Sequence, residues 1–500
     1  MPTTQKGRST RSRDLYDEIR ARIAEGTYAA GAALPSTRAL AAERGLARAT
    51  VTGVYEQLTA DGLIESRQGA ASRVIAGAGN ECPHPGAPIK GSCSDWSTPP
   101  VDRLSEIGKR LAAMSARDTQ PTNAGEIDFV YGPLSGNDFP ILAWSKALRT
   151  VERQRNARLE YEDPRGNLDL RQAIQRHLSQ ARGLVCTIEQ IMITNGSQQA
   201  LDLCARLLVN PGERVAVENP GYRAAHQTFL AYGAKLACID VDEHGLRTDQ
   251  LDSLGNAQLV YVTPTHQFPL GSFLPMNRRR QLLAWAVQQR AWVIEDDYDS
   301  EYRFSVRPEA SLQSLDVNDC VIHVGTFSKT LSPQLRLGYM VLPNSLVDTF
   351  VKAKQLSDRH AATGAQRALA LILNNGSYSR HLRRIRRLQL ARQRTLLEAL
   401  ETHLTGEVVV QGASSGLHVV VWFHKLPAQA EGDLVNAARE RGVRVYPLGP
   451  LFEPGTSESR DQMSAGLVMG YALLQEEMIW VGVKRLALAL HEVKKIYSVG

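Results

Sequence analysis

Two kinds of hydrophobic pattern divide the chain. Near the N-terminus, Leu15, Ile19 and Ile23 recur four residues apart and Gly26 follows, a spacing that predicts a helix over residues 13–24. In the larger C-terminal part, short runs rich in Val and Ile end in polar residues and are separated by segments of helix length. Such runs are typical of a mostly parallel sheet covered by helices, so we expect an α/β fold there.

The stretch LPSTRALAAERGLARATVTGVYEQLTADGLIE predicts two short helices joined by a turn. Ser36 stands at an N-cap position ahead of a helix at 37–43, residues 44–46 form a tight turn with a central glycine, and a second helix follows at 47–60. Residues 63–74 alternate as a strand, a turn and a second strand do. The pattern is that of a winged helix-turn-helix. The second helix is expected to bury Val51, Val54, Tyr55 and Leu58.

A helix-turn-helix places the start of its second helix in the major groove, where donors reach base edges and phosphates. Arg48 and Thr50 occupy that position, and Arg38 and Arg67 flank it as candidate backbone contacts. Residues 1–75 carry eleven Lys and Arg against eight Asp and Glu, a net charge of +3 that supports DNA binding only weakly. A helical hairpin that packs without DNA, with its arginines in solvent, fits the same pattern.

The motifs LPSTRALA and RATVTGVYEQLTADGLI resemble the winged helix of GntR-type bacterial transcription regulators over residues 11–79. The resemblance implies double-stranded DNA as a partner. The family usually has a Gly-x-Gly turn in the wing, whereas Gly69 is followed here by Ala70 and Ala71. The resemblance therefore supports a DNA contact by the wing less than it supports the rest of the winged helix.

A stretch dense in Gly, Pro and Ser, including GAGNECPHPGAPIKGSCSDWSTPP, separates the two patterns and predicts a linker. The expected domains are a winged helix at 11–79, a linker at 80–125 and an α/β effector domain at 126–500.

The composition limits which classes of protein this chain can belong to. With 43% hydrophobic and 22% charged residues, no apolar run of membrane-spanning length and no apolar core of a secretory signal at its start, the chain is expected to be cytoplasmic and to have no membrane partner. Six cysteines without CxxC or CxxH spacing argue against a disulfide framework and against a zinc site. The net charge of +6 permits a polyanionic partner without requiring one.

Four polar clusters follow predicted strands of the α/β part. Lys329 lies in GTFSKTLSPQLRLGY, Asp296 and Tyr298 lie in IEDDYD, Asn195-Gly196-Ser197-Gln198 closes a strand and opens a helix, and Tyr222 follows a Pro-Gly turn. Each alone has an ordinary explanation, such as a solvated lysine, a surface acidic pair or a packed aromatic ring. In parallel sheets, however, ligands bind beyond the carboxyl ends of the strands, where all four fall.

Together the clusters match the needs of pyridoxal 5′-phosphate (PLP), which are an imine-forming lysine, a carboxylate for the pyridine nitrogen, an aromatic face and an anion cup. The region 126–500 resembles fold-type I aminotransferases. By that resemblance Lys329 carries the aldimine, Asp296 pairs with the ring nitrogen, Tyr298 contacts the ring hydroxyl and Tyr222 stacks on the ring. The phosphate is held by Gly196, Ser197, Gln198, Thr326 and Arg336.

The segment YEDPRGNLDLRQAI at 161–174 is similar to one whose tyrosine commonly reaches the partner subunit's site in these proteins, which implies a homodimer. The whole chain, with THQFPLG, SRHLRRIRRL and SGLHVVV, resembles the MocR/GabR subfamily of GntR regulators. Leu270 and Gln389 depart from the usual residues of these families.

In LVMGYALLQEE, Val468 stands where aminotransferases and the regulators that sense γ-aminobutyrate carry an arginine that clamps the substrate carboxylate. Either another arginine, such as Arg460, has taken that role, or the effector lacks the carboxylate. We therefore expect a transcription regulator that senses PLP or an amine or amino acid, and favour PLP, as in the vitamin B6-controlling members. The alternative is an active aminotransferase carrying a DNA-binding domain.

Overall fold

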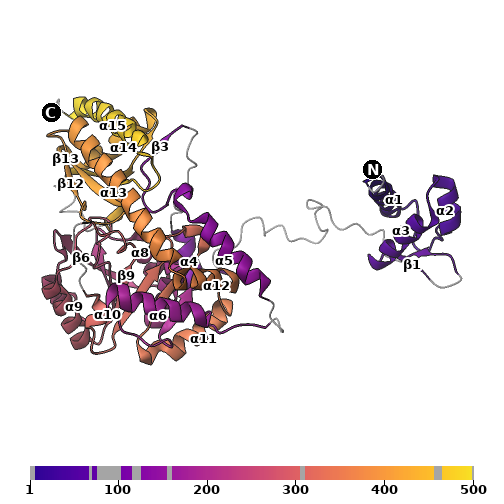
Figure 1. Ribbon diagram of the computed structural model, residues 1–500, viewed down its shortest axis with the longest axis horizontal. Helices are drawn as coiled ribbons and strands as arrows, with labels where there is room; N and C mark the ends of the chain where they lie inside the picture. Colours follow the sequence, from indigo (N-terminus) through magenta and orange to yellow (C-terminus); the bar gives the residue numbers. More distant parts are fainter. Residues whose placement is uncertain are drawn as a thin grey trace. The chain divides into compact units, whose positions relative to one another are not determined.

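The computed structural model describes residues 6–66, 70–75, 103–114, 125–154, 160–304, 310–454 and 464–497, with side chains from residue 12 onward. The chain divides into two compact units, residues 1–100 and 101–500 (Figure 1). Within the described residues, no helix is both long and apolar enough to cross a membrane.

The described residues of the first unit form three helices and a two-stranded sheet. These elements are α1 (Lys6–Ala24), α2 (Thr37–Arg44), α3 (Arg48–Ala60), β1 (Ile64–Glu65) and β2 (Arg73–Val74). Ser36 caps α2 by accepting a bond from the Ala39 N–H at 3.1 Å, and Gly45 ends that helix in the left-handed region at φ 60°. The predicted helix-turn-helix is confirmed, whereas α1 starts at Lys6 rather than at residue 13, because its first polar residues carry no hydrophobic period.

One small core holds the first unit together. The four residues predicted for the inner face of α3 are all buried, and they pack against Leu15, Ile19 and Ile23 of α1. The Tyr55 hydroxyl donates to the Pro35 carbonyl at 2.8 Å, which ties α3 to the start of α2. β1 pairs with β2 in antiparallel register, as a wing requires.

The second unit is built on an eight-stranded sheet with the order β4-β11-β10-β9-β8-β5-β6-β7. The pairs from β10 through β9, β8 and β5 to β6 are parallel, and β11 and β7 are antiparallel to their neighbours. This confirms the mostly parallel sheet. The strands are β4 (Ile191–Thr194), β5 (Arg214–Asn219), β6 (Lys235–Asp242), β7 (Gly245–Leu246), β8 (Leu259–Val262), β9 (Trp292–Asp297), β10 (Val321–Thr326) and β11 (Gly338–Val341).

Helices cover both faces of this sheet, so its central strands are apolar on both sides. One face packs on α7 (Ser197–Leu208), α8 (Arg223–Ala231) and α11 (Val347–Asp358). The other face packs on α9 (Met276–Gln289) and α10 (Leu312–Leu315), and near β4 and β11 on α5 (Ile141–Arg153), α6 (Leu168–Arg182) and α12 (Thr363–Asn374). Short 3₁₀ turns lie at Gly136–Asp138, Thr248–Leu254, Pro333–Leu335 and Asn344–Leu346.

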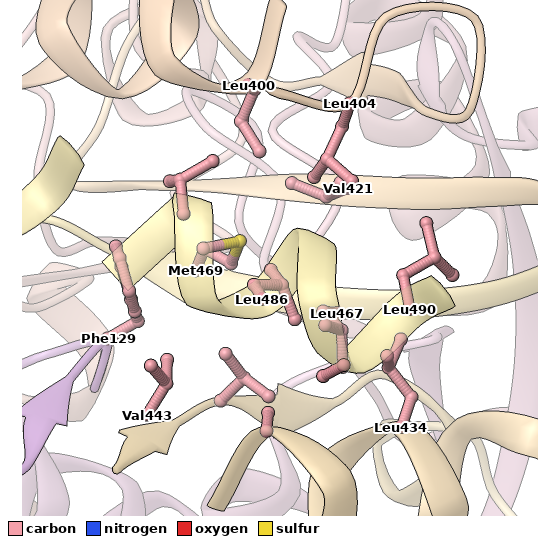
Figure 2. Packing of buried hydrophobic residues seen from close by; sticks show 14 of the residues in the cluster. Phe129, Leu400, Leu404, Val421, Leu434, Val443, Leu467, Met469, Leu486 and Leu490 are labelled. Carbon is pink, nitrogen blue, oxygen red and sulfur yellow. The ribbon is translucent and has the colours of Figure 1, made fainter. Parts of the chain in front are cut away.

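The C-terminal lobe of this unit has its own core around an antiparallel sheet of order β12-β13-β16-β15. Figure 2 shows Leu467 and Met469 of β16 packed against Leu486 and Leu490, with Phe129 from the start of the unit in the same cluster. The elements are β12 (Val409–Gln411), β13 (His418–Pro427), β15 (Tyr446–Pro447), β16 (Ser464–Gly470), the parallel pair β3 (Ile127–Asp128) and β14 (Val443–Arg444), α13 (Ser377–His403), α14 (Glu431–Glu440), α15 (Glu476–Tyr497), and 3₁₀ turns at Ala428–Ala430 and Gly449–Leu451.

Part of the stretch predicted as a linker forms a helix, α4 (Glu106–Ala113). Its cap, Ser105, accepts from the Gly108 N–H at 3.2 Å, and Arg110 Nε donates to the Ala231 carbonyl at 2.8 Å. α4 therefore packs on α8 and belongs to the second unit. The surrounding Gly, Pro and Ser conceal this short helix in the sequence.

Candidate functional site

The four polar clusters lie together in one cavity of about 480 Å³. They follow β4, β5, β9 and β10, whose carboxyl ends lie at one edge of the sheet. Eight of the nine predicted cofactor-binding residues line the cavity, namely Lys329, Asp296, Tyr298, Tyr222, Ser197, Gln198, Thr326 and Arg336. The ninth, Gly196, adjoins Ser197 and lies against the Arg336 guanidinium.

Lys329 lies in the turn that follows β10, and two tyrosine hydroxyls form hydrogen bonds with this turn. The Tyr302 hydroxyl donates to the Lys329 carbonyl at 2.6 Å, and the Tyr378 hydroxyl bonds to the hydroxyl of Thr330 at 3.0 Å. Lys329 Nζ donates to the Gly132 carbonyl at 3.0 Å. Fixed at its backbone, the side chain presents an amine to the cavity.

Asp296 lies near the end of β9 and is 4% exposed. The Tyr261 hydroxyl donates to its Oδ2 at 2.7 Å, while its Oδ1 is buried and has no hydrogen-bond partner among the described residues. Burial raises the pKa of Asp296 to about 6. A buried carboxylate with one unsatisfied oxygen is suited to a cationic ligand group.

The N-terminus of α7 forms an anion cup. Its N-cap, Gly196, has φ 80° and ψ 170° and provides no side-chain cap, so the first amides of the helix face the cavity unsatisfied by a cap. Arg336 donates from Nη2 to the Asn195 carbonyl at 2.7 Å. A Cβ at position 196 would come within 2.7 Å of that guanidinium, and the positive φ of this residue favours glycine.

Part of the cavity wall is aromatic. Phe268 is at its centre, with ring centroids 5.4 Å from Tyr131, 5.4 Å from His418, 5.8 Å from Tyr222 and 6.3 Å from Tyr298. Burial is the main cause that lowers the pKa of His418 to about 3, so this imidazole is neutral at physiological pH. The wall offers apolar faces and an uncharged ring.

Behind Tyr298 lies His266, which the sequence did not single out as a site residue. Its Nδ1 is 2.9 Å from the Tyr298 hydroxyl and 2.8 Å from Asp299 Oδ2. Its ring fills the space that a side chain at Gly416 would need, and Gly416 has φ 83°. His266 and Asp299 therefore fix the orientation of the Tyr298 ring.

The position expected to carry a carboxylate clamp is apolar. Val468 is fully buried, pairs with Val420 and Tyr446 in the C-terminal sheet, and packs in a cluster with Phe268 and Leu448. Arg460, the alternative clamp, lies outside the described residues. Within the described lining of the cavity, the cationic side chains are Lys329 and Arg336.

The predicted DNA-contacting residues of the first unit lie on α2 and α3. Arg38 and Arg48 are exposed, and Thr50 is half-buried on the first turn of α3. Arg67 lies outside the described residues. α3 begins at Arg48, after an Ala47 that forms no side-chain cap bond.

Residues missed by the sequence analysis share one property, which is that they come from strand interiors or from distant loops. Tyr261 lies within β8 and Thr263 directly follows that strand, Tyr131 and Gly132 lie in the loop after β3, and His418 opens β13. The run QLVYVTPTHQFPLG carried a usable signal, because its polar end lies beside those of β5 and β9 in the sheet order. No local pattern links residues 131 and 418 to that edge.

Comparison with known proteins agrees with both units. Residues 11–74 match the family model of bacterial regulatory proteins of the gntR family. The second unit is similar to a multiple substrate aminotransferase from Thermococcus profundus, with a TM-score of 0.70 at 28% identity over 77% of this chain and 98% of that chain. It is also similar to LysN, an α-aminoadipate aminotransferase from Thermus thermophilus, with a TM-score of 0.67 at 28% identity over 79% of this chain and 96% of that chain.

Full-length relatives combine the two units. A probable rhizopine catabolism regulatory protein, MocR, of Rhizobium meliloti is 34% identical over 95% of this chain and 92% of its own length. The pyridoxine biosynthesis transcriptional regulator PdxR of Corynebacterium glutamicum is 29% identical over 93% of each chain. With its gntR-type DNA-binding unit and its aminotransferase-like unit, this chain belongs to the MocR/GabR subfamily of GntR-type transcription regulators.

Proposed function

We propose that this regulator binds PLP covalently at Lys329 and that occupancy of the cavity changes its affinity for DNA. The observation that carries the proposal is the convergence of an amine, a buried carboxylate and an anion cup in one cavity. The residues fit the cofactor, because Asp296 Oδ1 is buried without a hydrogen-bond partner among the described residues, and because α7 begins without a side-chain cap beside the Arg336 guanidinium.

PLP supplies, when bound, an aldehyde that joins a lysine amine and a ring that withdraws electrons. In this arrangement Lys329 would provide the amine and Asp296 would pair with the ring nitrogen. Gly196, Ser197 and Gln198 of the cup would hold the phosphate, together with Thr326 and Arg336. Tyr222 would contact the ring, and Tyr298, whose hydroxyl lies 2.9 Å from His266 Nδ1, would hold the ring hydroxyl.

The effector is proposed to be PLP itself. A carboxylate that enters the cavity beside the cofactor would face Phe268, Leu417 and the neutral His418, and both described cations of the lining are engaged by the cofactor. An unpaired carboxylate in such surroundings costs several kcal/mol. Val468 is consistent with this, since it places an apolar side chain at the clamp position.

Double-stranded DNA is proposed to contact Arg48 and Thr50 at the start of α3, with Arg38 and Arg67 on the backbone. The protein is proposed to act as a homodimer in the cytoplasm. Tyr161 supports this, because it is 73% exposed although its ring lies under the Arg359 guanidinium at 4.5 Å, and an exposed tyrosine at this position is available to a partner subunit.

The test of covalent attachment is borohydride reduction of the PLP-loaded protein followed by peptide mapping. We expect visible absorption before reduction and a pyridoxyl group on Lys329 afterwards. Attachment to another lysine would overturn the site assignment. The exposed Lys352 of α11 is the matched control, and we expect its replacement by alanine to leave the absorption unchanged.

A further inference from the structure

The anion cup rests on a network that does not line the cavity. Behind it, Asn195 Nδ2 and Gln199 Nε2 each donate to Asp358 Oδ2 at 2.8 Å. Asp358 is the last residue of α11, so the two amides join the start of α7 to a separate helix. Gln199 Oε1 also accepts from the Asn195 N–H at 2.8 Å.

These contacts hold the backbone N–H, the backbone carbonyl and the side-chain Nδ2 of Asn195. Its N–H is held by Gln199, its side chain by Asp358 and its carbonyl by Arg336 Nη2 at 2.7 Å. Asn195 directly precedes Gly196, the N-cap of the cup. The orientation of the first amides of α7 is therefore set by Asp358, although that carboxylate lies outside the cavity lining.

A buried lysine balances the Asp358 carboxylate. Lys354 Nζ donates to Oδ1 at 2.7 Å and to Oδ2 at 2.9 Å, and the lysine side chain is fully buried. A carboxylate behind an anion cup opposes the charge of a bound phosphate, and one beside an ammonium does so far less. Lys354 thus allows a carboxylate to anchor the cup without repelling its ligand.

We propose that Asp358 and Lys354 are positioning residues for the phosphate group of the ligand. Asp358 fixes the geometry of the cup through Asn195 and Gln199, and Lys354 neutralises the charge that this anchor introduces. The identity of the ligand as PLP rests on the proposed function. The roles of the two residues concern any phosphate in the cup.

Three variants separate geometry from charge. K354M keeps the Asp358 acceptor but leaves its charge uncompensated. K354M/D358N keeps an acceptor oxygen and removes both charges, and K354M/D358L removes both charges and the acceptor. The two double variants differ in whether residue 358 can accept hydrogen bonds from Asn195 and Gln199, whereas K354M and K354M/D358N differ in the charge of residue 358.

Each variant is titrated with PLP and with pyridoxal, which lacks the phosphate, and the Kd is read from the visible absorption. We expect K354M/D358L to weaken PLP binding about tenfold or more, the range found for outer partners of a binding site, and to leave pyridoxal binding nearly unchanged. K354M is expected to weaken PLP binding more than pyridoxal binding, because the uncompensated Asp358 carboxylate repels the phosphate, and K354M/D358N is expected to bind PLP close to wild type. K494M, which breaks the Lys494–Glu407 pair of the C-terminal lobe, is the control.

A ratio of PLP to pyridoxal affinity that stays at its wild-type value would overturn the proposal. If both affinities fall equally, the variants have damaged the structure in general and not the phosphate site. If K354M/D358L fails to fold, K354M and K354M/D358N are compared with each other. This comparison tests whether Lys354 neutralises the charge of Asp358. A wild-type protein that does not attach PLP to Lys329 contradicts the proposed function instead. The same variants are then titrated with inorganic phosphate by calorimetry, which tests the cup by itself.

Discussion

The two units each contain a helix whose N-terminus is proposed to bind a phosphate, and the two helix starts differ in how their surroundings are held. Neither α3 nor α7 has a side-chain N-cap, so the first amides of both helices are open to an anion. Around α3 the donors are exposed side chains, with Arg48 at the helix start and Arg38 on α2. Around α7 the preceding residue, Asn195, is bound at its N–H, carbonyl and side chain.

The difference corresponds to the ligands. DNA is a polymer whose phosphates are read along a surface, where long exposed arginines adapt to the backbone. A single small phosphate gains affinity from a site that is ordered before binding. In this proposal the regulator uses an uncapped helix N-terminus twice. It is surrounded by exposed arginines in α3, for DNA, and is preorganised in α7, for a small phosphate.

The largest expected effect is on the preorganised site. Lys329→Ala removes the amine that PLP needs, so we expect complete loss of visible absorption and of borohydride-trapped cofactor. The fold is retained, because the Lys329 turn is held by backbone bonds to Tyr302 and Phe327. Absorption spectroscopy and thermal unfolding together check this, and a variant that retains a trapped cofactor would contradict the assignment.

Asp296→Asn changes the same site, and the sign of its effect depends on whether PLP is bound. In the cofactor-free protein the folded pKa, about 6, lies above the ordinary 3.8, so stability falls as the pH rises from about 4 to about 6 and the loss is complete above that. The variant should therefore be more stable than wild type at pH 8, by up to about 3 kcal/mol, and gain nothing at pH 4. Thermal unfolding at both pH values measures this.

With PLP present the sign reverses, because the charged partner of the ring nitrogen is lost. We expect roughly tenfold weaker PLP binding by Asp296→Asn. Asp249→Asn is the control, since Asp249 is exposed and its pKa is lowered by Arg247, so this change gains no stability. A variant no more stable than wild type at pH 8 would show that the buried carboxylate is satisfied in some other way.

Arg48→Ala tests the exposed site. We expect a loss of about 1–3 kcal/mol in affinity for the operator if the side chain reads a base, and a uniform loss with a salt slope lower by about one if it contacts phosphate. PLP binding should not change. Arg20→Ala, another exposed arginine, on α1, is the matched control, and equal losses from both variants would remove α3 from its assigned role.

The smallest expected effect is on the stability of α2, the helix that packs against α3. Ser36→Ala removes the cap of α2 and should destabilise that helix by about 1 kcal/mol. Faster hydrogen exchange confined to the α2 amides is the expected result. Exchange that accelerates equally in α7 would show that the change is not local.

The sequence predicted what depends on local pattern. The Ser36 cap, the buried face of α3 and the polar ends of the parallel strands follow from spacing and propensity, and the structure confirms them. The Asp358 anchor could not be predicted, because Asn195 lies 163 residues away and no period links the two. Helix α4 was missed because its stabilising contact, Arg110 to Ala231, is tertiary.

The central claim is that occupancy of Lys329 changes DNA binding, which requires a ligand to bind one DNA-binding state better than the other. The direct measurement is the affinity and footprint of the full chain on the DNA upstream of its own gene. It compares cofactor-free protein, PLP-loaded protein and loaded protein with common amino acids, and includes Lys329→Ala. We predict that PLP alone alters both quantities and that Lys329→Ala does not respond. If PLP alone leaves both unaltered while an amino acid changes them, the account is wrong.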